Sequence, residues 1–136
     1  MQGFSTNSSP GKITESTDLY VADAGPKGRG VFAGRAFRKG EIIEKCPIIP
    51  WEHEELYRLA GHLLERYVFL WDKRKKSLAV VLGFGSLYNH SSLPNCSYSR
   101  QIKNQLIVFR ARRPIAQNEE LTIHYGPSAE SFHEKT

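Results

Sequence analysis

Residues 87–99 read LYNHSSLPNCSYS, and this stretch joins two strongly apolar runs. Its turn formers and side-chain amides predict a loop of fixed shape. Asn89 and Asn95 can hydrogen-bond to neighbouring backbone and tolerate unusual φ and ψ, and Pro94 keeps Leu93 extended. A loop held in one shape can present its backbone groups to a ligand. The alternative interpretation is an ordinary connection between two strands.

Two distant stretches make the pattern more specific. Residues 28–33 read GRGVFA upstream, and residues 118–126 read NEELTIHYG downstream. The three patterns together resemble a SET domain, the fold of protein-lysine methyltransferases. In that family a Gly-x-Gly turn comes first, an Asn-His-Ser-x-x-Pro-Asn loop follows, and a Glu-Glu-Leu-x-x-x-Tyr-Gly strand closes the domain. The resemblance extends from about residue 19 to residue 126 and is greatest for the small stand-alone SET proteins of viruses and bacteria.

The resemblance implies a mainly β fold with one amphipathic helix, the SET-domain (β-clip) fold of many short strands with a knot-like C-terminal substructure. We expect the SET domain at residues 18–126, a disordered polar tail at 1–17 and a short C-terminal tail at 127–136. A chain of 136 residues with 40% hydrophobic content is large enough for one core and has no room for a second domain.

The local patterns agree with a β-rich layout. Residues 19–22 and 31–33 read as short strands around a glycine-rich turn, and residues 78–84 and 106–109 read as apolar strands. A Lys-Gly turn leads into a strand at residues 37–44, and a second turn–strand pair lies near residues 116–123. Apolar residues between 56 and 67 fall at helical spacing, which predicts an amphipathic helix over residues 52–67, weakened at Gly61.

The glycine-rich turn is the first candidate binding element. Gly28 and Gly30 allow positive φ and let a ligand approach the backbone closely, although a plain hairpin turn has the same pattern. No third glycine opens a helix, so this is no dinucleotide fingerprint. The resemblance implies that this turn and the Asn-His pair bind S-adenosylmethionine together with the closing tyrosine. The implied cofactor-binding residues are Lys27, Gly28, Arg29, Gly30, Asn89, His90 and Tyr125.

The resemblance also implies the catalytic residue and the channel for the substrate lysine. The tyrosine of the closing motif, Tyr125, is the catalytic residue in that family. The channel positions fall on Tyr67, Tyr98 and Ile123. Many relatives have Phe or Tyr where Ile123 stands, and this position influences how many methyl groups are added, so product multiplicity stays open. By residue type alone, an aromatic such as Tyr67 is more often part of a core than of a binding site.

Composition limits the remaining alternatives. Two cysteines, Cys46 and Cys96, are too few for a disulfide framework or a four-ligand zinc cluster, so we expect no metal. No apolar run reaches the ~18 residues of a membrane span, so we expect an intracellular protein, with a viral or effector setting compatible. The formal charge is +5, but the basic run at residues 73–76 has no interleaved aromatics, and no direct contact with nucleic acid is expected.

The expected function is S-adenosylmethionine-dependent methylation of a lysine ε-amine in a protein such as a histone. The alternative is a non-catalytic SET-like module that binds a peptide or protein. A small basic nucleic-acid-binding barrel rests on charge alone. The Cys-x-Cys zinc segment that often follows the closing motif is absent, so another element must close the channel. The C-terminal tail with Phe132 and a second subunit in a homodimer are the candidates.

Overall fold

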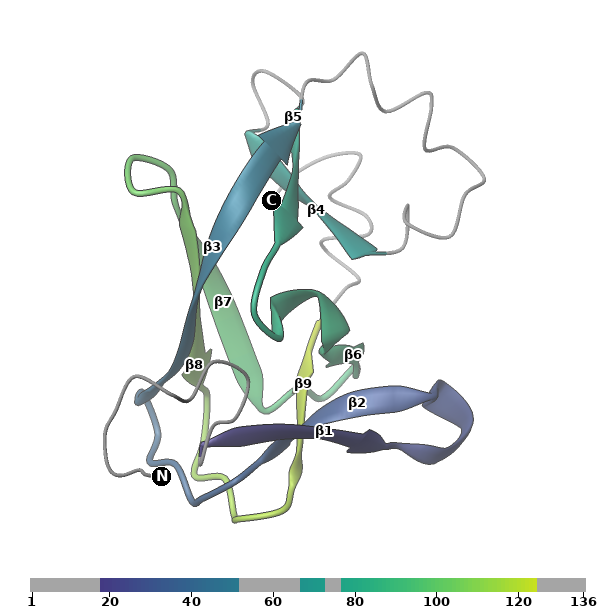
Figure 1. The fold of residues 1–136 in the computed structure, drawn as a ribbon. Coiled ribbons are helices and arrows are strands. Elements are labelled where there is room, and N and C mark those ends of the chain that lie inside the picture. Colours follow the sequence, from purple (N-terminus) through teal and green to yellow (C-terminus); the bar gives the residue numbers. More distant parts are fainter. Residues whose placement is uncertain (1–17, 52–66, 73–76, 125–136) are drawn as a thin grey trace, which may run out of the picture.

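A computed structural model of the chain describes residues 18–51, 67–72 and 77–124 (Figure 1). The N-terminal tail, the predicted helix apart from Tyr67, Tyr125 and the C-terminal tail lie outside the described residues. The described strands are β1 (Leu19–Asp23), β2 (Arg29–Ala33), β3 (Ile42–Trp51), β4 (Val68–Asp72), β5 (Ser77–Val81), β6 (Asn89–His90), β7 (Cys96–Gln101), β8 (Leu106–Ala111) and β9 (Glu120–Ile123). Two short 3₁₀ helices, η1 (Gly25–Lys27) and η4 (Gly85–Leu87), complete the described elements.

The strands form two sheets, which confirms a mainly β architecture. One sheet has the order β1-β2-β9-β6 and the other the order β4-β5-β3-β8-β7. In Figure 1 the β1–β2 hairpin lies across the lower part of the molecule, while the long β3 and the β7–β8 hairpin rise from it. Strand β9 comes from the end of the described chain and inserts between β2 and β6. The closing strand therefore lies between the two segments predicted to bind cofactor.

Glycine conformations close the β1–β2 hairpin. Leu19 pairs with Ala33 and Asp23 with Arg29, so the whole of β1 lies antiparallel to β2. Between the strands, the Asp23 carboxylate accepts the Gly25 N–H at 3.0 Å, and Gly25 and Gly28 have φ of 79° and 84°. Residues with a Cβ rarely adopt such φ values, so glycine at these two positions fixes the hairpin loop.

The five-stranded sheet buries one face in the main core. Strand β8 places Ile107, Phe109 and Ala111 on that face, all at most 2% exposed, while Arg110 between them is exposed. Their partners across the sheet include Cys46 of β3 and Tyr98 of β7. Val108, on the opposite face, is also only 1% exposed, so on β8 that face is covered at Val108 and open to solvent at Arg110.

The two predicted turn–strand pairs are confirmed and have matching geometry. Glu41 accepts the Arg38 N–H at 2.9 Å in the first turn, and Glu119 accepts the Ala116 N–H at 3.0 Å in the second. The third residue of each turn has positive φ, 84° at Gly40 and 72° at Asn118. A bridge between Phe37 and Ile115 sets the two turns side by side.

The strand predicted over residues 78–84 is shorter than expected. Strand β5 ends at Val81, because the next residues turn toward a carboxylate of β3. The Phe84 N–H donates to Oε2 of Glu44 at 2.9 Å, and Gly83 has φ of 68°. A Cβ at Gly83 would lie 2.6 Å from that same oxygen. Hydrophobicity alone could not reveal this turn.

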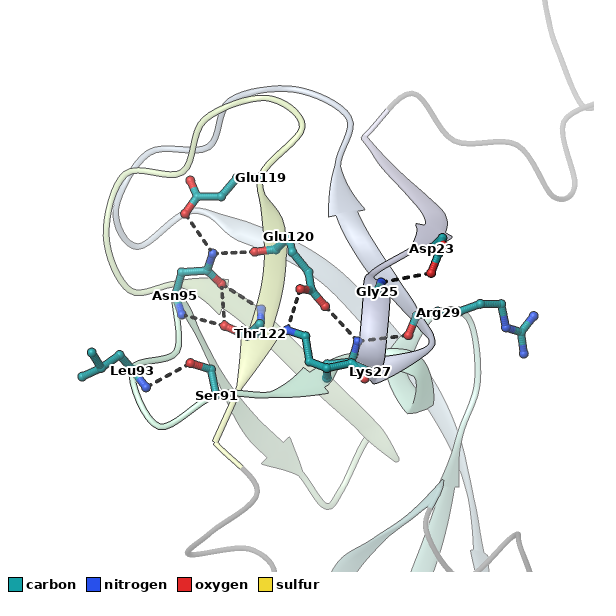
Figure 2. Close-up of polar contacts among 11 residues, drawn as sticks. Asp23, Gly25, Lys27, Arg29, Ser91, Leu93, Asn95, Glu119, Glu120 and Thr122 are labelled. Atoms are coloured by element: carbon teal, nitrogen blue, oxygen red, sulfur yellow. Dashed lines mark hydrogen bonds and ion pairs between the residues drawn. The ribbon is translucent and has the colours of Figure 1, made fainter.

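The central loop and the closing strand meet, as the resemblance to SET domains implies. Strand β6 pairs in parallel with β9, Asn89 opposite Thr122 and His90 opposite Ile123. The Ser91 N–H extends the pairing by donating to the Ile123 carbonyl at 2.9 Å. The loop that follows carries Leu93 outward and Asn95 inward toward β9 (Figure 2). The knot-like threading of the family stays a prediction.

Asn95 joins this loop to β9 through its side chain. It is 2% exposed, and its amide oxygen accepts the Thr122 N–H at 2.8 Å. Its amide nitrogen donates to the Glu120 carbonyl at 2.8 Å (Figure 2). Its own N–H lies 3.3 Å from the Thr122 hydroxyl, which accepts it. One asparagine thus satisfies two buried backbone groups of β9, which is how an amide can replace a neighbouring strand.

We expect Asn95→Ala to lower the free energy of unfolding by about 3 kcal/mol, because a backbone N–H and a carbonyl of β9 lose their partners in the interior. Urea unfolding followed by fluorescence measures the change. Asn104→Ala, in the exposed β7–β8 turn, is the matched control and should change stability by less than about 0.5 kcal/mol. Equal effects of the two substitutions would contradict the role of Asn95.

Candidate functional site

A carboxylate on β9 connects the two segments predicted to bind cofactor. Oε1 of Glu120 lies 2.7 Å from Nζ of Lys27, in the turn between β1 and β2. Its Oε2 accepts the side-chain amide of Asn89 at 2.8 Å. The Glu120 side chain is 18% exposed, so these contacts lie at the edge of the interior, where charge-assisted hydrogen bonds are strong. Figure 2 shows Glu120 reaching from β9 toward Lys27.

The side chain of Asn89 has its orientation set from two sides. Its amide nitrogen donates to the Arg29 carbonyl at 3.0 Å as well as to Glu120. Both donor positions of that nitrogen are therefore used. Among the contacts of the described residues, the amide oxygen of Asn89 receives no donor, so it is available as an acceptor for a bound molecule.

Gly30 is required by this close approach. A Cβ at Gly30 would lie 2.5 Å from Oε2 of Glu120 and 2.8 Å from the amide nitrogen of Asn89. At Gly28 a Cβ would meet nothing within 4 Å, but φ is 84° and ψ is −138°, a conformation that is essentially restricted to glycine. Glycine is thus required at the two positions for different reasons. Gly30 makes room for the Asn89–Glu120 pair, and Gly28 shapes a turn with open space beside it.

His90 lies beside a second histidine at the end of β9. The rings of His90 and His124 are 5.0 Å apart in an edge-to-face arrangement. Partial burial, and then the nearby His124, lower the pKa of His90 below its usual value. The lowered pKa favours the neutral form of His90.

Tyr88 and Glu44, which the sequence patterns did not single out, fix the position of the segment before Asn89. Tyr88 is 1% exposed, and its ring stacks on Phe109 with centroids 4.3 Å apart. Its hydroxyl donates to Oε1 of Glu44 at 2.9 Å, and burial raises the pKa of Tyr88 well above the usual value. The one local signal for this contact in the sequence is the glutamate within the mostly apolar β3. A carboxylate on the core face of a strand needs a hydrogen-bond donor.

The comparisons with known proteins agree with this arrangement. Residues 28–126 match the SET domain family. A histone-lysine N-methyltransferase of Schizosaccharomyces pombe, specific for H3 lysine-37, is 37% identical over 110 residues, which cover 79% of this chain and 73% of the relative. The chain belongs to the SET-domain family.

Solved structures show the same fold. A crystal structure of a candidate histone methyltransferase of Plasmodium falciparum has a TM-score of 0.68 and 30% identity, covering 82% of this chain and 96% of that one. A chain of ctPRC2, in an autoinhibited conformation bound to S-adenosylmethionine, has a TM-score of 0.68 at 20% identity. Only 15% of that larger chain is covered, so it shows the fold alone. The expectation of an enzyme of the protein-lysine N-methyltransferase class is confirmed by the family and by the 37% identical relative.

The SET domain brings one predicted channel residue into an aromatic group. Tyr98 lies edge-to-face with Phe69 at 5.3 Å and 5.9 Å from Phe109. Tyr67 adjoins β4, and its carbonyl accepts the Ser86 hydroxyl at 3.0 Å. Ile123 is 1% exposed and belongs to the core. The channel roles of these residues stay predictions, as does that of Tyr125 outside the described residues.

Other chemistries find little support in the described part of the chain. Cys46 and Cys96 are buried and free, and burial raises the pKa of Cys96 to about 12 and that of Cys46 further. Neither thiol is a nucleophile at neutral pH. Among the described residues no three His, Cys, Asp or Glu side chains are grouped for a metal ion, and no helix could span a membrane.

We expect Gly30→Ala to destabilise the SET domain by 1–3 kcal/mol, because the new methyl group overlaps Glu120 and Asn89. Adding Glu120→Ala should recover part of that loss by removing the nearer of the two atoms. A double-mutant cycle of urea unfolding measures the coupling. Strict additivity of the two substitutions would contradict the close approach of Gly30 to Glu120.

Proposed function

We propose that this SET domain transfers a methyl group from S-adenosylmethionine to the ε-amine of a lysine in a histone tail or a similar basic protein tail. The observation that supports this most is the junction at Glu120. It holds the Lys27–Gly28 turn and Asn89, which the family resemblance assigns to cofactor binding, against one strand.

The residues present fit such a cofactor. Gly30 leaves no side chain between the turn and Asn89, and the space beside Gly28 is open. The amide oxygen of Asn89 provides a hydrogen-bond acceptor for a polar, nucleoside-containing molecule. S-adenosylmethionine, when bound, supplies an electrophilic methyl group on a positively charged sulfur.

The task of the protein in such a reaction is alignment and control of one proton. Holding two reactants in line can contribute ~7–11 kcal/mol, and it requires no nucleophilic side chain. The attacking amine must be neutral. Apolar surroundings such as the Tyr98–Phe69 pair lower the pKa of an amine by removing water, and a nearby positive charge lowers it further. His90 is assigned to cofactor binding and not to proton transfer.

Tyr125 is proposed as the catalytic residue, and Tyr67, Tyr98 and Ile123 as residues of the lysine channel. Tyr125 follows His124, whose ring lies beside that of His90. In the proposed role, the Tyr125 hydroxyl would accept hydrogen bonds from the amine and from the polarised methyl group. We further propose the knot-like substructure at the C-terminal end of the domain at residues 18–126, and closure of the channel by the tail or by a second subunit.

The substrate class is proposed from the relatives. The Schizosaccharomyces pombe protein is specific for H3 lysine-37, and the Plasmodium falciparum structure is of a candidate histone methyltransferase. A histone substrate would place the enzyme in the nucleus. The number of methyl groups added stays open. Ile123 is smaller than the aromatic residue that many relatives have at this position.

The test is transfer of labelled methyl from S-adenosylmethionine to core histones, comparing the native chain with Tyr125→Phe. We expect label on lysine with the native chain and a loss of at least 100-fold with Tyr125→Phe, since the hydroxyl acts on the reacting groups. Tyr20→Phe is the matched control. This variant loses a hydroxyl on the β1–β2 hairpin that donates a hydrogen bond to the Asn118 side chain, and it should keep its activity.

Calorimetry with S-adenosylmethionine separates the alternatives. Binding without transfer to histones would point to a different protein substrate. Absence of both binding and transfer would favour a non-catalytic SET-like binding module and would contradict the proposal.

A further inference from the structure

The outer face of the five-stranded sheet carries cations that the described acidic residues do not pair with. Residue pairing puts Lys45 of β3 opposite Val108 of β8, and Ser97 of β7 opposite Arg110 of β8. Since cross-strand partners share a face, Lys45, Arg110 and the serines of β7 lie on one side, opposite Phe109 and the core. Lys45, Ser97, Ser99 and Arg110 are all exposed, whereas Val108, on the same side, is 1% exposed.

Further cations extend this face at both ends of β8. The Gly40 N–H donates to the Ala111 carbonyl at 2.8 Å, and an Arg110 nitrogen lies 3.4 Å from the Gly40 carbonyl. Arg38 and Lys39 belong to the turn beside Arg110, and Lys103 belongs to the turn that joins β7 to β8. We call this set the basic face; its members are Arg38, Lys39, Lys45, Lys103 and Arg110.

The carboxylates near the basic face form their hydrogen bonds and ion pairs with other groups. Glu41 bonds to Arg35 at 2.9 Å and to the Arg38 backbone, and Glu119 pairs with Arg113. Glu44 lies on the core face with Tyr88. Among the described residues, no ion pair joins a carboxylate to Lys39, Lys45, Lys103 or Arg110, while Glu41 is near enough to Arg38 to attract its charge. The charge of those four residues is therefore available to a partner.

We propose that the basic face binds the phosphate backbone of double-stranded nucleic acid. A six-residue strand such as β8 is about 20 Å long. DNA presents one negative charge per ~1.7 Å of its axis, so a surface of this length, with Arg110 on β8 and Lys45 on the neighbouring β3, would lie against several phosphates. The exposed hydroxyls of Ser97 and Ser99 add hydrogen-bond donors, which phosphate oxygens accept. The expected binding is independent of base sequence.

This inference reverses the expectation that no nucleic acid is bound, which rested on the short run at residues 73–76. The cations of the basic face come from three separate parts of the chain, so no run of basic residues announced them. The proposal goes beyond methyl transfer and does not depend on it, because binding is measured without cofactor or histone.

The test uses fluorescence anisotropy of a labelled 30-base-pair DNA duplex titrated with the full chain at several salt concentrations. Neutralising three to five phosphates predicts a slope of log K against log salt of about −2.7 to −4.5, so affinity should fall about 40- to 500-fold between 50 and 200 mM salt. The double variant Lys45→Gln with Arg110→Gln should weaken binding at least tenfold at 50 mM salt and make the slope smaller by about 2.

The double variant Lys45→Arg with Arg110→Lys is the matched control, because it preserves both charges and should bind within about threefold of the native chain. Thermal unfolding of both double variants checks that they fold. Absence of duplex binding at 50 mM salt, or an unchanged slope in the glutamine variant, would overturn the proposal. So would competition by polyglutamate or by vesicles of anionic lipid that exceeds competition by unlabelled duplex at equal charge concentration.

Discussion

The pairing of the Asn95 amide with β9 is the interaction on which the site depends. Within the part of the chain that the structure describes, strand β9 has β2 on one side and the two-residue β6 on the other. The Asn95 side chain takes the place of a longer neighbouring strand by bonding to Thr122 and Glu120. Because β9 also carries Glu120 and ends beside His90, this one buried amide fixes the strand that joins both candidate cofactor segments.

Glu120 explains why the separated motifs of the family occur together. The second glycine of the Gly-x-Gly turn is needed because Asn89 and Glu120 fill the space where its side chain would lie. The asparagine of the Asn-His pair is oriented by that glutamate and by the turn itself. Residues of the three motifs therefore contact one another. A substitution in any one motif disturbs a contact that it shares with the other two.

Local patterns in the sequence predicted the parts of the fold that local forces decide. They predicted the turn–strand pairs and the hairpin glycines, whereas the meeting of loop and closing strand was implied by the family resemblance alone. The contacts of Glu44 with Tyr88 and of Glu120 with Asn89 were not, because they join residues 44 and 31 positions apart and leave no periodic signal. The early end of β5 has the same cause, since Glu44 takes the backbone of Phe84. The basic face likewise exists only once β3 and β8 pair.

The most direct measurement is a titration of the labelled protein with S-adenosylmethionine followed by amide NMR. If the junction at Glu120 forms the cofactor site, the signals of residues 27–30 and 89–91 shift together and saturate at one concentration. Signals of Lys45 and Arg110 on the outer face stay unchanged. Shifts confined to the outer face, or saturable binding that leaves both segments unaffected, would contradict a cofactor site built from the glycine turn and the Asn-His loop.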